Sequence, residues 1–169
     1  MNKKTLTVFT PAYNRGYIIK NCYDSLCRQT CKDFIWLVVD DGSTDNTAEL
    51  IKEWQKNDNG FEIRYIYKEN GGMHTAHNTA YENIDTELNV CVDSDDYMTD
   101  DAVEKIINCW NECKSNRLAG IIALDINPNG KVIGKELPTG ITETTLIGYY
   151  ENGGAGDKKL IYRTDVINS

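Results

Sequence analysis

The chain has 169 residues, which is within the usual span of one domain. With 40% hydrophobic and 26% charged residues, it has the composition of an ordinary globular protein, which argues against long disordered segments. Its net charge of -8 disfavours a protein that binds nucleic acid or anionic lipid through a broad basic surface. A polyanionic ligand would need local cations or a metal ion to offset the charge repulsion.

The sequence predicts neither a membrane span nor a signal peptide. The longest apolar run, residues 34–39, is too short to cross a bilayer, and Pro11 stops the first apolar stretch after a few residues. We therefore expect a cytoplasmic protein, which contacts the inner face of the membrane only through segments outside this chain. Because the chain ends shortly after its last predicted strand, we also expect it to be part of a longer protein.

Apolar periodicity predicts strands that alternate with helices. The run 34–39 is apolar throughout, which is typical of a strand covered on both faces. Five strands are expected, over residues 5–10, 34–39, 61–67, 88–92 and 119–125.

Helices are predicted between these strands. Two of them cover residues 17–29 and 74–83. A third would begin after Ser43 or Thr44, and a fourth after Thr99, because hydroxyl side chains are favoured N-caps.

The last third of the chain has a different pattern. Residues 127–130 read as a hairpin turn into a short strand, residues 135–158 have only weak periodicity, and residues 159–163 resemble one more strand. The element order predicts an α/β fold with a mainly parallel sheet, helices on both faces, and an antiparallel extension after residue 125.

Six cysteines could suggest disulfides or a zinc site, but a reducing compartment argues against disulfides. Neither pair at a spacing of four residues has the tight knuckle spacing or nearby His of a zinc site. We therefore expect small buried side chains. The cysteines are Cys22, Cys27, Cys31, Cys91, Cys109 and Cys113.

Polar segments follow four of the predicted strands at the point where each strand ends. In open α/β sheets, ligands bind outside the carboxyl ends of the strands, so these segments should form one rim. The four segments are 11–15, 40–43, 69–72 and 93–96.

Each segment allows two interpretations when taken alone. The carboxylates of Asp93-Ser94-Asp95-Asp96 suit Mg²⁺ or Mn²⁺, but Asp95 or Asp96 could instead cap the next helix. The carboxylate of Asp41 could accept a hydrogen bond from a nucleotide, or it could fix its own turn. The loop 11–15 could hold a flat base, with Arg15 facing a phosphate, or be an ordinary connection.

Two glycines, Gly71 and Gly72, would let the backbone approach a ligand closely. His74 and His77 lie near the start of the following helix, but two His without an acid at matching spacing are a weak metal signal. For His77 we favour a capping or solvent-exposed role, and for His74 the role stays open.

Three segments together resemble the family 2 glycosyltransferases, which have the GT-A fold. They are Thr10-Pro11-Ala12-Tyr13-Asn14-Arg15, the stretch 38–45 that contains Asp40-Asp41-Gly42-Ser43, and the stretch 92–96. Asn70-Gly71-Gly72 and Ala76-His77-Asn78 resemble a further family segment. The resemblance covers residues 5–125 well and residues 126–169 only loosely.

The resemblance implies a role for several residues. Pro11 to Tyr13 would line the nucleotide base, Asp41 would bond its imide edge, most often that of uracil, and Asp95 would bind a divalent cation, Mn²⁺ or Mg²⁺. Asp93 would contact the ribose or the metal, and Asp96 would support it. The nucleotide-binding residues implied are Thr10, Pro11, Ala12, Tyr13, Arg15, Asp41, Gly71, Gly72, Asn78, Asp93 and Ser94.

The implied activity is inverting, metal-dependent transfer of a sugar from a nucleoside diphosphate, a UDP-sugar above all, to an acceptor hydroxyl that the sequence does not identify. Cell-surface polysaccharide or glycoconjugate synthesis is its expected context. Residues 1–169 would be one GT-A type domain truncated at its C-terminal side, with the nucleotide-sugar-binding half over 1–125 and the start of the acceptor side over 126–169.

Two departures from the family pattern stand out. Met73 occupies a position where many relatives carry Lys, which leaves Arg15 or Lys68 as the phosphate cation. The catalytic base of inverting members lies beyond the last strand. Asp157 is the candidate nearest to that position, and we expect the base to lie outside this chain.

Other functions fit less well. A phosphatase that uses Asp93 as nucleophile would need a small hydroxyl where Tyr97 stands, and a nucleotidyltransferase would need a glycine-rich loop after the first strand. A nucleotide-binding remnant without catalysis, or an interaction domain, stays open because of Met73 and the missing base.

Overall fold

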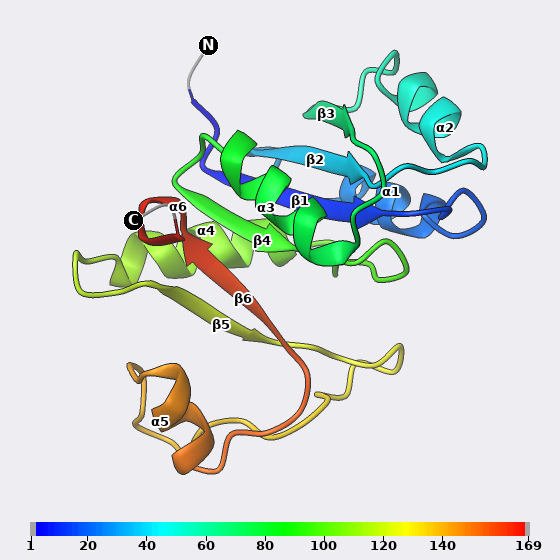
Figure 1. Ribbon diagram of the computed structural model, residues 1–169. Helices are drawn as coiled ribbons and strands as arrows, with labels where there is room; N and C mark the ends of the chain where they lie inside the picture. Colours follow the sequence, from blue (N-terminus) through cyan, green and yellow to red (C-terminus); the bar gives the residue numbers. More distant parts are fainter. Residues whose placement is uncertain (1–2, 168–169) are drawn as a thin grey trace. The chain divides into compact units, whose positions relative to one another are not determined.

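The computed structural model describes residues 3–167, over which strands and helices alternate (Figure 1). The strands are β1 (Leu6–Ala12), β2 (Phe34–Asp40), β3 (Glu62–Tyr67), β4 (Leu88–Cys91), β5 (Gly120–Leu124) and β6 (Lys158–Arg163). The helices are α1 (Lys20–Cys27), α2 (Thr47–Trp54), α3 (Met73–Asn83), α4 (Ala102–Cys113), α5 (Leu146–Glu151) and α6 (Thr164–Ile167).

The chain forms two compact units. One contains the residues up to Ile121 and those from Ile161 onward, and the other is Ile122–Leu160. The first unit contains β1 to β4 with α1 to α4, and the chain returns to it through the end of β6.

The strands are hydrogen-bonded in the order β3-β2-β1-β4-β6-β5. The first four are parallel, with Leu6 opposite both Phe34 and Leu88. β6 runs antiparallel to β4 and pairs Ile161 with Val90. The predicted α/β class, the mainly parallel sheet and the antiparallel extension after residue 125 are therefore confirmed.

The two faces of the parallel sheet are covered by different helices. On one face, Trp36 of β2 stacks on Tyr23 of α1 and Trp54 of α2, with ring centroids 5.9 and 6.1 Å away. On the other face, Phe9 and residues of β2 pack against α3, which lies in front of the strands in Figure 1. All seven residues of β2 are buried, as its continuous apolar run predicts.

The first strand is longer than its sequence suggests. Pro11 led us to end it at Thr10, whereas β1 continues to Ala12 and pairs Pro11 with Val39. The pairing of β1 with β4 ends at Phe9, so Pro11 has a neighbouring strand on one side only. Proline is tolerated at an unpaired strand edge, because no neighbouring strand there requires a hydrogen bond from the backbone N–H that proline lacks.

The helix starts also differ from the predictions. The N-cap positions of α2 and α4 are Asn46 and Asp101, and neither side chain makes a capping hydrogen bond. Ser43, Thr44 and Thr99 lie further upstream, so the predicted caps are wrong. α1 begins at Lys20, three residues later than expected, after a turn over 16–19.

In the second unit, the predicted hairpin is present as an antiparallel bridge between Ile126 and Val132. The weakly periodic stretch contains α5, whose N-cap hydroxyl on Thr145 accepts a hydrogen bond from the Gly148 N–H at 2.9 Å. Tyr149 on this helix is buried and donates to the carbonyl oxygen of Lys135 at 3.1 Å, which joins two segments of the unit.

The cysteines of residues 3–167 form no disulfide with one another, and they differ in burial. Cys22 is buried, but Cys109 and Cys113 are exposed on α4, so the expectation of burial is wrong for that pair. The residues 3–167 contain no helix that is long and apolar enough to span a membrane.

Candidate functional site

The loops that follow the four parallel strands meet at one edge of the sheet, because parallel strands end on the same side. Asn14, in the loop after β1, connects to the loop after β2. Its backbone N–H donates to Ser43 Oγ at 2.9 Å, and its side-chain oxygen accepts from the backbone N–H of Thr44 at 2.8 Å. Asn14 has a φ of 53°, which Asn tolerates better than most residues.

Asp45 strengthens the same connection. One carboxylate oxygen accepts from the backbone N–H of Gly16 at 2.9 Å, while the other accepts from both the N–H and the hydroxyl of Thr47. Burial works to raise the pKa of Asp45, but these hydrogen bonds outweigh it and hold the pKa below its usual value. The loops after β1 and β2 are therefore held together by a carboxylate that stays ionised.

Asp41 is the centre of a second connection, between the loops after β2 and β3. Its buried carboxylate accepts from the ammonium of Lys68 and from the backbone N–H groups of Gly71 and Gly72, at 3.0 and 2.8 Å for the two glycines. These contacts support the interpretation that Asp41 fixes its neighbouring turn. The carboxylate oxygen that accepts from Gly72 can still accept a second hydrogen bond from another donor.

The charge of Asp41 is stabilised in place. Burial acts to raise its pKa, but the hydrogen bonds from Lys68, Gly71 and Gly72 lower it further than burial raises it. Gly42 makes the close approach of the two loops possible: at its φ of +84°, a Cβ would lie 2.8 Å from the backbone nitrogen of Asn70.

Asp40, beside Asp41 in the sequence, points into the protein instead. It is fully buried and accepts from the Ser43 N–H at 2.8 Å and from the Tyr65 hydroxyl at 2.6 Å. Burial and this carboxylate raise the pKa of Tyr65 well above its usual value. The two adjacent carboxylates therefore have separate tasks, since Asp40 holds the strand ends and Asp41 faces the rim.

The acidic loop, defined here as Asp93–Asp96, follows β4 and forms a tight turn in which the Asp96 N–H donates to the carbonyl of Asp93 at 3.0 Å. Ser94 is buried, whereas Asp95 and Asp96 are exposed. Within residues 3–167, no cluster of three or more His, Cys, Asp or Glu side chains could hold a metal alone. The loop instead fits a cation that is held by one or two carboxylates together with phosphate oxygens, as is usual for Mg²⁺.

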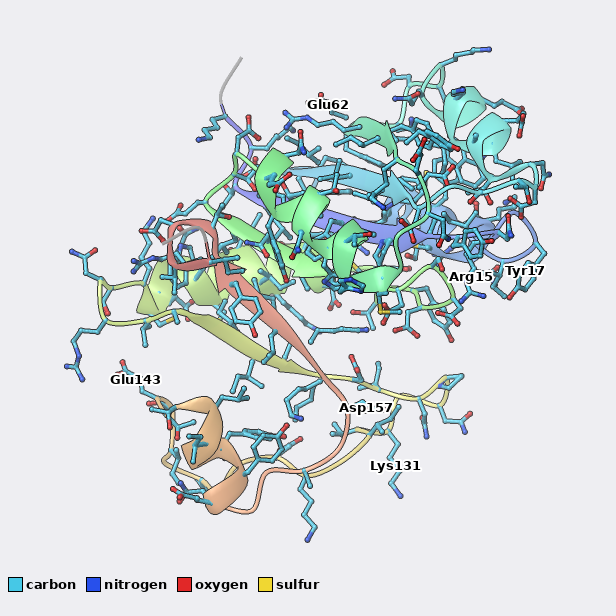
Figure 2. The ribbon with its side chains drawn as sticks, in the orientation of Figure 1. Arg15, Tyr17, Glu62, Lys131, Glu143 and Asp157 are labelled. Carbon is cyan, nitrogen blue, oxygen red and sulfur yellow. The ribbon has the colours of Figure 1, made fainter. Side chains whose placement is uncertain are left out.

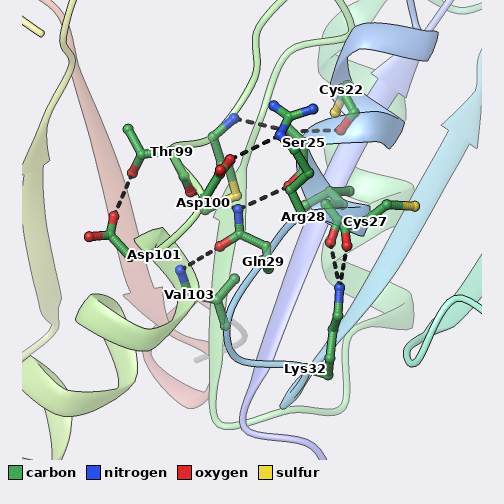
Figure 3. Close-up of polar contacts among 12 residues, drawn as sticks. Cys22, Ser25, Cys27, Arg28, Gln29, Lys32, Thr99, Asp100, Asp101 and Val103 are labelled. Atoms are coloured by element: carbon green, nitrogen blue, oxygen red, sulfur yellow. Dashed lines mark hydrogen bonds and ion pairs between the residues drawn. The ribbon is translucent and has the colours of Figure 1, made fainter.

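The segment after the acidic loop is fixed to α1 (Figure 3). Ser25 Oγ on α1 accepts from the Met98 N–H at 3.2 Å. Thr30, which follows α1, donates its backbone N–H to the carbonyl of Asp100 at 2.8 Å. The buried side chain of Gln29 contacts this segment as well, and sequence reasoning missed it. A lone Gln at a helix end gives no signal, because its partners Thr99 and Val103 lie 70 and 74 residues away in sequence.

His77 lies on α3 beside β4, half-buried rather than in solvent, so the favoured capping or solvent role is wrong. Its ring meets the edge of Phe9 at a centroid distance of 5.2 Å, and Nε2 lies 3.8 Å from Cys91 Sγ. Burial lowers the pKa of His77 more than the charge of Asp93 raises it. His74, by contrast, is exposed.

The remaining predicted residues fall into different environments. The hydroxyl of Thr10 is fully buried and accepts from Trp36 Nε1 at 3.0 Å, so Thr10 has a structural partner within the core. Tyr13 is 49% exposed at the rim. Figure 2 shows Arg15 beside Tyr17 in the loop after β1, where the Arg15 guanidinium donates to the Tyr17 hydroxyl at 2.9 Å. Pro11 and Ala12 are the last two residues of β1.

On α3, Asn78 and Met73 are exposed, and Met73 has 65% of its surface accessible. Lys68 is engaged with Asp41 and with the carbonyl oxygen of Glu69. Asp157 is an exposed carboxylate of the second unit (Figure 2). The other predicted residues all belong to the first unit, and the role of Asp157 stays a prediction.

Comparison with known proteins adds independent observations. The chain is 34% identical over 128 residues to a chondroitin synthase of Pasteurella multocida, which covers 76% of this chain and 13% of that protein. It superposes on Staphylococcus aureus TarS 1-349 in complex with UDP-GlcNAc with a TM-score of 0.71 and 22% identity, over 97% of this chain and 46% of that one. It also superposes on a Pyrobaculum calidifontis mannosyltransferase in complex with GDP-Man and Mn²⁺ with a TM-score of 0.64 and 21% identity, over 76% and 37%.

These similarities agree with the sequence motifs at the rim. The two solved structures show the same GT-A fold, and the chain spans only a small part of the curated synthase. The family model for glycosyl transferase family 2 matches residues 7–167, nearly the whole chain. The chain belongs to glycosyl transferase family 2.

Proposed function

We propose that this chain forms the donor-binding part of an enzyme that transfers a sugar, with inversion, from a nucleoside diphosphate to an acceptor hydroxyl. A UDP-sugar is the donor we favour, in the synthesis of a cell-surface polysaccharide or glycoconjugate. Family membership supports sugar transfer, and the chondroitin synthase supports the polysaccharide context. The TarS complex with UDP-GlcNAc supports the choice of uridine.

In this proposal, the nucleoside binds at the rim between Tyr13 and the loop after β3. The remaining acceptor capacity of Asp41 receives the imide N–H of the base, since the carboxylate stays ionised in its buried position. Gly71 and Gly72 have no side chains, which lets their backbone lie close to Asp41 and Thr75; a Cβ at Gly71 would lie 2.7 Å from Thr75 Oγ1. Asp93 and Ser94 lie where β4 ends and serve the ribose.

The diphosphate would bind a Mn²⁺ or Mg²⁺ ion together with Asp95, and Asp93 or Asp96 would support that ion. When bound, such an ion stabilises the negative charge that develops on the leaving diphosphate. The chain itself has a net charge of -8 and an acidic rim, so a cation is needed to offset the repulsion. Arg15 supplies a further positive charge from the loop after β1.

The observation that carries the proposal is the position of the acidic loop. It lies at the same strand edge as Asp41 and the loop after β1, within a fold that matches nucleotide-sugar complexes. The catalytic base that deprotonates the acceptor hydroxyl would come from a part of the protein outside this chain. Asp157 is the less favoured alternative.

The test is a calorimetric titration with UDP, GDP, dTDP and CDP, each with and without Mn²⁺. We expect one nucleotide, UDP, to bind, with an affinity that rises about tenfold or more when Mn²⁺ is present. In Asp95→Ala the metal dependence should disappear. Asp58→Ala removes an exposed carboxylate from the loop before β3 and should bind like the parent chain.

Two results would count against the proposal. Binding that is equal with and without Mn²⁺, or an unchanged metal effect in Asp95→Ala, would remove the assigned cation site. Binding of no nucleotide by this chain or by the full-length protein would favour an interaction domain without catalysis.

A further inference from the structure

We propose that Gln29 is a positioning residue for the acidic loop, and that it sets the geometry in which Asp93 and Asp95 meet the metal-bound diphosphate. This inference rests on the proposed function. Gln29 lies two residues after the end of α1 and contacts no part of the expected ligand site directly. Its side chain is 3% exposed.

The amide of Gln29 connects three parts of the first unit (Figure 3). Its Nε2 donates to the Ser25 carbonyl at 3.1 Å and to the Thr99 carbonyl at 2.7 Å. Its Oε1 accepts from the Val103 N–H at 3.0 Å. Both donor hydrogens are therefore used, and the oxygen satisfies one of the N–H groups that the start of α4 leaves without a helical partner.

This arrangement explains why α4 has no cap of its own. The side chains of Thr99 and Asp101 contact each other, at 3.1 Å, instead of the helix N–H groups. The capping acceptor comes from Gln29, which is 74 residues away in sequence. Because a buried amide that loses its partners carries the full cost of desolvation, this contact fixes the start of α4 relative to α1.

The fixed segment begins directly after the acidic loop. Met98 donates its N–H to Ser25 on α1, and Val103 donates its N–H to Gln29 just after α1, so these two residues hold the chain from Met98 to Val103. On its other side, the loop continues from β4, where the Val92 N–H donates to the Phe9 carbonyl at 2.9 Å. The acidic loop is thus held at both ends, by the sheet and by α1.

Ligand geometry makes this hold relevant to function. A carboxylate that shares a cation with a diphosphate must stay within a few tenths of an ångström of its productive position, and supporting contacts provide that precision. Asp95 is exposed and lies between these two ends of the loop. The position of its carboxylate therefore depends on both ends, of which Gln29 supports one.

The test compares Gln29→Leu, which keeps the size but removes the hydrogen bonds, with the control Ile63→Ala. Ile63 is 8% exposed on β3, three strands away from β4, and its truncation lowers the stability of the same unit. Ser25→Ala is a milder second variant: it removes the acceptor of the Met98 N–H and the bond that the hydroxyl donates to the Cys22 carbonyl, but it keeps the bonds of the Gln29 amide. All are measured at a temperature where each is folded by circular dichroism.

Two readouts are used. Hydrogen exchange at the Asp96 amide, whose partner is the Asp93 carbonyl and not Gln29, reports the order of the loop. We expect about tenfold faster exchange in Gln29→Leu, a smaller increase in Ser25→Ala and no change in Ile63→Ala. The second readout is the factor by which Mn²⁺ raises UDP affinity, which should fall about tenfold in Gln29→Leu while metal-free UDP affinity stays the same.

The outcomes separate the two proposals. If Gln29→Leu and Ile63→Ala have the same Asp96 exchange and the same Mn²⁺ effect, Gln29 only stabilises the fold and the inference is overturned. If the parent chain itself shows no Mn²⁺ effect, the proposed function fails, and the exchange measurement still decides whether Gln29 holds the loop. If Gln29→Leu does not fold, Gln29→Asn, which keeps the amide group but withdraws it from Thr99 and Val103, decides by the same two measurements.

Discussion

Replacing Asp41 by Asn is the sharpest test of the connection between the loops after β2 and β3. The substitution keeps the shape of the side chain but removes its charge and exchanges one acceptor oxygen for an NH₂ group. In the orientation that preserves the bonds from Lys68 and Gly71, the new NH₂ group faces the N–H of Gly72, which now donates to Asp41 at 2.8 Å. One backbone donor therefore loses its acceptor.

The magnitude follows from burial. An unsatisfied buried donor costs about 1–3 kcal/mol, and the loss of a charge-assisted bond to Lys68 adds about 1 kcal/mol. The side chains of Asp41 and Lys68 are 5% and 20% exposed, so water replaces little of the lost interaction. We expect Asp41→Asn to lower the free energy of unfolding by about 3 kcal/mol at neutral pH.

Urea unfolding of both proteins as a function of pH measures this effect. The pKa of Asp41 is lowered in the folded state, so its contribution is present above the unfolded pKa of about 4 and is lost as the pH falls through the folded pKa. The stability difference between parent and variant should stay constant from neutral pH down to about pH 5, and then shrink in more acidic solution.

Asp24→Asn is the matched control. Asp24 also pairs with a lysine, Lys20, whose Nζ lies 2.6 Å from Asp24 Oδ2. This pair is exposed on the surface of α1, and such pairs contribute less than about 1 kcal/mol to the free energy of unfolding. The reasoning fails if Asp41→Asn costs no more than Asp24→Asn. It also fails if the difference persists unchanged into strong acid, because the contacts to the carboxylate would then not depend on its charge.

Two further predictions concern β1 and the loop that follows it. Thr10→Val removes the acceptor of the buried Trp36 indole N–H and should lower the free energy of unfolding by about 2 kcal/mol, while UDP affinity in calorimetry stays unchanged; a loss of affinity with full stability would instead assign the hydroxyl to the ligand. Asn14→Ala and Asn14→Gly both remove the side-chain acceptor of Thr44 and of the Asp45 N–H, but only Asn14→Ala places a Cβ at a φ of 53°. Thermal unfolding should therefore show the Ala variant about 1 kcal/mol less stable than the Gly variant. Equal stability would mean that the backbone strain at this position is negligible.

The sequence predicted the elements better than their ends. Periodicity located the strands of the parallel sheet because their apolar runs are buried on both faces, as in β2. Pro11 misled the prediction of the β1 end because its tolerance depends on where β4 stops, which is a property of the sheet and not of the local sequence. Helix starts failed for the same reason: the acceptor at α4 comes from Gln29, far away in the chain.

The site shows a similar division. The clustering of polar loops at one edge was predictable, since strand direction alone determines it. The side-chain partners were not, because Asp41 binds Lys68 and two glycine amides whose positions depend on the register of β2 and β3. His77 has the polarity of a surface residue but packs on Phe9, and that contact depends on how α3 packs against β1, which the local sequence does not show.

The return of the chain through β6 has a consequence for folding during synthesis. Asn89 on β4 donates to the carbonyl of Tyr162 on β6 at 3.4 Å, across 73 residues of sequence. The four parallel strands can assemble once β4 has left the ribosome. The edge of β4 that pairs with β6 stays uncovered until the chain has been synthesised through the second unit. Closing so long a loop is entropically slow, and an uncovered strand edge is open to wrong pairing in the meantime. The docking of β6 should therefore be the late step in folding, and the half-made domain should be the form most prone to aggregate.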